Sequence, residues 1–94
     1  MAATWYRPAV EHYLRLGIRE IEPTNPGTKK WKDTVHKWLA SLPAPDRVFI
    51  KIVFDSDNSY SLKSVMPTLP GKEGDNWHRL NALEKAFAQF AEMM

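Results

Sequence analysis

The 94-residue chain contains no cysteine. Disulfide bonds and thiolate metal ligands are therefore excluded, and a reducing intracellular compartment suits the composition. A membrane-spanning helix needs about 20 consecutive apolar residues, whereas the longest apolar run, residues 48–54, is short and interrupted by Lys51. The N-terminal residues lack a basic segment followed by an apolar one, so no secretory signal is expected. These absences predict a cytoplasmic protein that does not enter membranes.

The chain also lacks a strong excess of either charge. Thirteen Lys and Arg residues oppose eleven Asp and Glu residues, which leaves a formal net charge of +2. A nucleic-acid-binding domain is typically more basic, with its cations clustered on one face. Hydrophobic residues make up 44% of the chain and charged residues 26%, which is typical of a folded protein rather than a disordered one. We expect one domain spanning residues 1–94.

Proline and glycine divide the sequence into segments. The first predicted helix begins near residue 5 or 8 and ends at Leu16, with Gly17 as its C-cap. The second covers residues 28–42, with Thr28 as its N-cap. The last begins after Asp75 or Asn76. Its apolar stripe contains Leu80, Leu83, Phe87, Phe90 and Met94.

The second predicted helix interleaves lysine and tryptophan along the sequence. On a helical wheel these residue types separate, because the apolar side chains recur every three or four positions. The apolar stripe contains Trp31, Val35, Trp38, Leu39 and Leu42. The opposite, polar face contains Lys29, Lys30, Lys32, His36 and Lys37. The pattern is typical of an amphipathic helix whose tryptophans point inward.

Residues 47–54 are β-branched and aromatic apart from Arg47 and Lys51, which favours a strand. Residues 55–59 are rich in Asp, Asn and Ser and are typical of a turn. Residues 60–66 would return as a second strand, and residues 18–22 would form a short third one. The predicted fold class is α+β, in the order α-(β)-α-β-β-α. Three helices would pack on a two- or three-stranded antiparallel sheet.

The predicted strand at 47–54 is apolar on both faces, so the sequence predicts a second cover for it. A protein partner or a homodimer formed through the hairpin would supply this cover. The residues expected to bind a partner are Phe49, Lys51, Val53, Trp5 and Trp77. The leading hypothesis is a small non-enzymatic binding or regulatory module, of the accessory or inhibitor type. Compact domains without cysteine are common among bacterial and phage-encoded regulators.

Two alternatives remain open. The lysine face of residues 28–42, formed by Lys29, Lys30, Lys32, His36 and Lys37, would contact phosphates in a nucleic-acid-binding regulator. A small metal-independent ribonuclease would instead combine His36 and His78 with neighbouring cationic side chains. The acidic turn at 55–59 lacks the glycine and glutamate that a calcium loop requires. No cofactor and no metal are expected.

Overall fold

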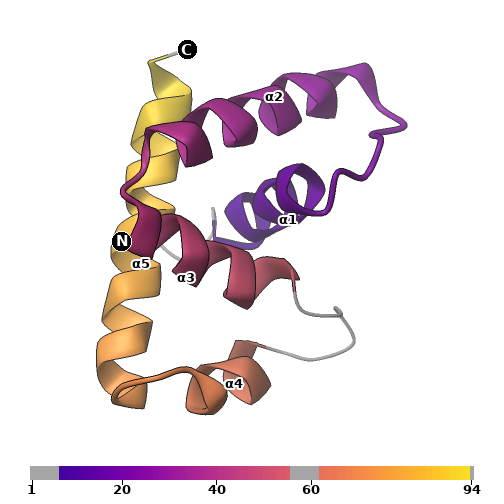
Figure 1. The fold of residues 1–94 in the computed structure, drawn as a ribbon. Helices are drawn as coiled ribbons and strands as arrows, with labels where there is room; N and C mark the ends of the chain where they lie inside the picture. The colour runs from indigo at the N-terminus through magenta and orange to yellow at the C-terminus, as the bar shows by residue number, and fades with distance from the viewer. Residues whose placement is uncertain (1–6, 56–61, 94) are drawn as a thin grey trace.

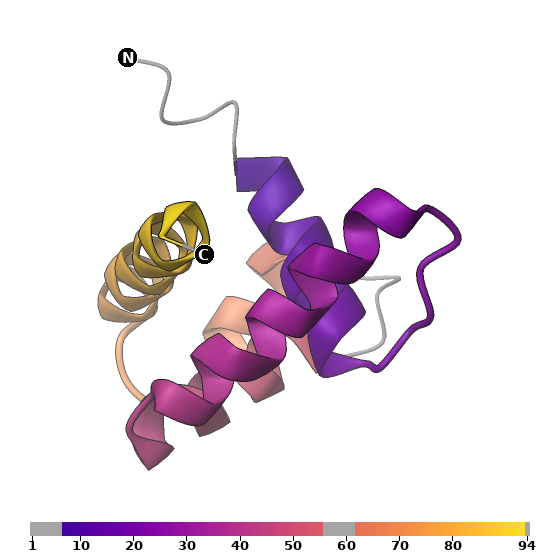
Figure 2. The same ribbon diagram turned by 90° about the horizontal axis from the view of Figure 1, so that it is seen from above.

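The computed structural model describes residues 7–55 and 62–93, and every regular element in these ranges is a helix (Figure 1). Helix α1 contacts α2, α3 and α5, so it is the central element of the fold. Helix α5, the longest, lies along one side of the other helices (Figures 1 and 2). The elements are α1 (Arg7–Ile18), α2 (Pro26–Ser41), α3 (Ala44–Asp55), α4 (Leu62–Val65), the 3₁₀ helix η2 (Met66–Thr68) and α5 (Glu73–Glu92).

The predicted α+β fold class is wrong, because the segment taken as its clearest strand is helix α3. Phe49, Ile50, Val53 and Phe54 are all buried, and their spacing of one, three and one residues places them on one helical face. Pro45 lies in the first turn, where proline is tolerated. The β-propensity of these residues costs only tenths of a kcal/mol each in a helix, roughly, so burial of this face decides the conformation.

The two other predicted strands are also wrong within the described residues. Residues 62–65 form α4 and residues 66–68 form η2, while Tyr60 lies outside the described residues. In residues 18–22, Ile18 ends α1 and the following residues form a turn. The buried side chains of the α4–η2 segment have helical rather than alternating spacing. They are Leu62, Val65, Met66 and Leu69.

The three predicted helices are confirmed, but their ends differ from the prediction. Helix α2 begins at Pro26, because the Asn25 side chain accepts a hydrogen bond from the Gly27 N–H at 2.8 Å. Helix α5 begins at Glu73, three to four residues earlier than expected, with Lys72 as its N-cap residue. Helix α1 continues through Gly17, which is therefore not its C-cap. Met94 lies outside the described residues.

Close approach of two helices explains why Gly17 lies inside α1. A Cβ atom at this position would lie 2.5 Å from both Cβ and Cγ1 of Val35 on α2. Val35 is fully buried, so its side chain has no free volume into which it could move. Glycine at position 17 therefore sets the distance between α1 and α2.

We predict that Gly17→Ala destabilises the protein by about 1–3 kcal/mol, because the added methyl group overpacks the contact with Val35. Alanine alone would favour a helix by up to about 1 kcal/mol. Gly74→Ala is the matched control, since nothing lies within 4 Å of a Cβ atom at that position of α5. Chemical denaturation measures both variants. Equal stabilisation by the two substitutions would contradict the close approach.

The turn that ends α1 is a Schellman motif with an unusual residue. The Ile21 N–H donates to the carbonyl of Leu16 at 3.1 Å, and the Glu20 N–H donates to that of Gly17 at 3.4 Å. Glu20 adopts a left-handed conformation with φ of 55°. Glycine is the preferred residue here because a side chain is strained in this region.

We therefore expect Glu20→Gly to stabilise the protein by roughly 0.5–1 kcal/mol, as relief of the strain exceeds the entropy cost of glycine. Glu20→Ala is the control, because it removes the charge and keeps the Cβ atom. Thermal unfolding of the two variants distinguishes the causes. A similar gain from alanine would show that charge, rather than backbone conformation, limits stability here.

A long-range contact joins α3 to α5. The Arg79 Nη2 atom lies 2.6 Å from Oδ1 of Asp46, and its guanidinium lies over the Phe49 ring, 4.6 Å from the centroid. The pair is partly exposed, so the ion pair itself adds little stability. The planar guanidinium stacks on the Phe49 ring and also donates hydrogen bonds to Asp46. A lysine side chain could not make both contacts in this geometry.

Candidate protein-binding groove

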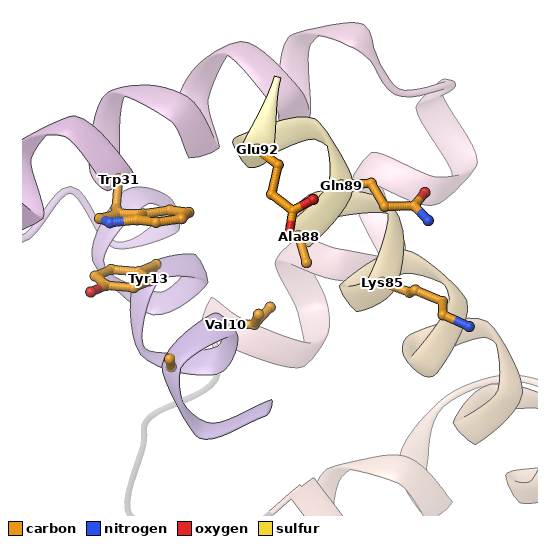
Figure 3. A pocket seen from close by; sticks show the side chains of 8 residues that line it. Val10, Tyr13, Trp31, Lys85, Ala88, Gln89 and Glu92 are labelled. Carbon is orange, nitrogen blue, oxygen red and sulfur yellow. The ribbon is translucent and has the colours of Figure 1, made fainter. Parts of the chain in front are cut away.

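A pocket of about 540 Å³ opens between α1 and α5, with one residue of α2 at its end (Figure 3). Its volume lies in the range of sites that accommodate ligands or partner side chains. We call this pocket the α1–α5 groove. It is lined by Ala9, Val10, Tyr13, Trp31, Lys85, Ala88, Gln89 and Glu92.

Two aromatic rings form one end of the groove. Tyr13 of α1 and Trp31 of α2 are stacked, with ring centroids 4.7 Å apart and planes inclined by 12°. Trp31 also contacts the fully buried Phe87 edge to face, with ring centroids 6.1 Å apart. Tyr13 and Trp31 are only partly buried. One side of the stacked pair packs against the core, and the ring edges on the other side line the groove (Figure 3).

On the opposite wall, a face of α5, Ala88 packs partly against the core and the other groove residues are exposed. The four groove residues of this face recur at spacings of three, one and three, and therefore share one helical stripe. Ala88 is small, the carboxylate of the exposed Glu92 lies beside it, and the exposed Lys85, at the other end of the stripe, extends its side chain away from α1 (Figure 3). Neither charged group forms an ion pair with a described residue. The groove is thus mainly apolar, with one anion beside Ala88 and one cation at the far end of the α5 stripe (Figure 3).

The structure separates the residues that the sequence had grouped as partner-binding. Phe49 and Val53 are 7% and 0% exposed and face the core of the domain, so they contribute no surface. Lys51 is exposed on the outer side of α3. Trp77 is half-buried, and its indole N–H donates to Glu73 at 3.4 Å. Trp5 lies outside the described residues. The predicted hairpin dimer has no hairpin within the described part of the chain.

The predicted lysine face is partly occupied by internal ion pairs. Lys32 is buried, and its ammonium group lies 2.9 Å from the Glu22 carboxylate in the turn between α1 and α2. Lys29 pairs with Asp33 one helical turn away, at 3.1 Å. Lys30 and Lys37 are exposed. Lys32 was predicted on the polar face, whereas its side chain is only 11% exposed.

The residues of the ribonuclease hypothesis lie on different helices, and His36 and Arg79 have structural partners. Nε2–H of His36 donates to the Gly17 carbonyl at 2.8 Å, because a carbonyl oxygen can only accept. Arg79 contacts Asp46 and Phe49 of α3, as described above. His78 is exposed on α5. Within residues 7–55 and 62–93, no three His, Asp or Glu side chains are placed to hold a metal ion.

Lys32 lowers the pKa of Glu22 below its ordinary value of 4.5, by donating a hydrogen bond and by its positive charge. A depressed carboxylate pKa stabilises the folded state above the ordinary value, and this stabilisation is lost as pH falls through the folded-state pKa. We therefore predict that the wild type loses more stability than Glu22→Gln over that acidic range. Thermal unfolding at a series of pH values measures the difference.

The control for this prediction repeats the comparison in a Lys32→Met background. Without the ammonium group, chains with and without the Glu22→Gln substitution should respond alike to acid, because the interaction that lowers the pKa is gone. The effect is modest, since the Glu22 side chain is 86% exposed. An unchanged difference between the two chains in that background would assign the acid response to another carboxylate.

Comparison with known proteins gives no family assignment. No family model matches the chain, and neither a curated protein nor a solved structure is similar to it. Among the described helices, none is long and apolar enough to cross a membrane.

Sequence reasoning did not identify the α1–α5 groove. The sequence places Trp31 on an apolar helical face, but its stacking on Tyr13 depends on how α1 packs against α2. The stripe on α5 is visible in sequence only as a mixed polar face. A weak signal existed in Ala88, a small residue between Lys85 and Glu92, although one alanine does not distinguish a groove from an ordinary surface.

Proposed function

We propose that the chain is a small non-enzymatic binding module that receives an amphipathic helix of a protein partner in the α1–α5 groove. The observation that carries this proposal is the groove's chemistry: a mainly apolar lining backed by the Tyr13–Trp31 stack, with one cation, Lys85, and one anion, Glu92, on its α5 wall. A helix laid into a groove is a common mode of peptide recognition. These two charges favour a partner helix with an acidic and a basic residue.

The arrangement of the walls supports a helical occupant. Two helices, α1 and α5, flank the groove (Figure 3). The small side chains of Ala9 and Ala88 on these walls would let a third helix approach closely. The partner's apolar side chains would contact Val10 and the aromatic edges, which are held by the core. Because these rings are already packed, little side-chain entropy would be lost on binding. Lys85 and Glu92 would set the direction of the bound helix.

We predict that Ala88→Arg removes partner binding, because a long charged side chain would fill the centre of the groove. Tagged wild-type and variant chains are used to capture proteins from lysate of the producing cells, and captured proteins are quantified. Ala82→Arg is the matched control, since Ala82 is exposed on α5 and does not line the groove. Proteins retained by the wild type and by Ala82→Arg should be lost with Ala88→Arg.

Two further measurements make this result decisive. Thermal unfolding must show that both variants remain folded, and capture must persist when salt is raised, because the contact is mainly apolar. Retention that falls steeply with salt would instead favour the nucleic-acid alternative. Identical capture by all three chains would reject the groove as the binding surface.

A further inference from the structure

We infer that the helix received by the α1–α5 groove is α3 of a second copy of this chain; this inference rests on the proposed function. The outer side of α3 carries two apolar residues that the core does not cover. Val48 is 54% exposed and Ile52 is 48% exposed, and a spacing of four residues places them side by side. The exposed Lys51 lies between them along the helix, and the exposed Asp55 follows Ile52 by three residues. We call these four residues the α3 ridge.

The charges of the ridge complement those of the groove. Lys51 and Asp55 form no ion pair within the described residues, and the same holds for Lys85 and Glu92. Within this part of the chain, the ridge therefore presents one cation and one anion without an ion-pair partner, and the groove presents another such pair. Placing Asp55 of one copy near Lys85 of the other, and Lys51 near Glu92, satisfies all four groups.

This pairing fixes the direction of docking, with α3 antiparallel to α5. Residues 51 and 55 are about 6 Å apart along their helix, and residues 85 and 92 are about 10.5 Å apart. The lysine and glutamate side chains are long and flexible enough to span the difference. In this register Ile52 enters the centre of the groove near Ala88. Val48 lies toward the C-terminal end of α5, where Met93 is 82% exposed.

The contact joins two different surfaces, the α3 ridge of one copy and the α1–α5 groove of the other. It either occurs twice in a closed dimer or repeats along a chain of copies. Both assemblies bury the exposed apolar residues of α3 and the open side of the groove. They also differ from the predicted hairpin dimer, because the contact uses Val48 and Ile52 and leaves Phe49 and Val53 in the core.

Sedimentation equilibrium over a range of protein concentrations at low salt tests the inference. The wild type should self-associate, and Asp55→Lys or Lys85→Asp alone should weaken association by about tenfold or more, because like charges meet across the interface. The combined variant Asp55→Lys with Lys85→Asp should recover association, since the pair is restored with reversed sign. Lys30→Asp is the control for charge reversal, because Lys30 is an exposed helical lysine outside both surfaces.

The outcomes separate this inference from the proposed function. The inference is overturned if the wild type is monomeric at every concentration. It is also overturned if neither Asp55→Lys nor Lys85→Asp changes the strength of association. If Ala88→Arg still removes captured proteins in that case, the groove remains a binding surface for a different protein. If Ala88→Arg changes neither association nor capture, the inference and the proposed function both fail. Circular dichroism of each variant confirms that its helices are retained.

Discussion

The packing of α1 against α2 depends on the absence of a side chain at Gly17. A Cβ atom there would lie 2.5 Å from Val35, so the two helices can approach this closely only with glycine. The approach also brings His36 to the Gly17 carbonyl and Tyr13 against Trp31. Because α1 also contacts α3 and α5, a shift between α1 and α2 would disturb both the core and the groove.

Three basic side chains donate hydrogen bonds to carbonyl oxygens near helix ends in this fold. Arg15 donates to the Phe54 carbonyl near the end of α3, Arg47 donates to the Leu42 carbonyl at the end of α2, and His36 donates to the Gly17 carbonyl near the end of α1. The last carbonyls of a helix have no partner within it and carry partial negative charge. One side chain of the predicted lysine face, His36, is thus engaged inside the molecule.

The sequence was sufficient for the helices whose apolar residues recur with helical period and are bounded by proline or glycine. It failed at residues 47–54, where consecutive apolar residues fit a strand and a buried helix equally well. The apolar character of both strand faces was in fact the sign of a helix, since Lys51 and Asp55 share the outer side with Val48 and Ile52. The groove could not be predicted, because three helices from both ends of the chain form it.

Because helices from both ends of the chain form the groove, a partner can bind there only after the domain has folded. Ala9 lies near the start of the described residues and Glu92 near their end, so the groove exists only after α5 has docked on α1. Any occupant therefore binds the native state and not a partly folded one in which α5 is detached. By mass action, such an occupant raises the free energy of unfolding in proportion to the logarithm of its concentration. Occupancy and resistance to local unfolding of the C-terminal helix would rise together.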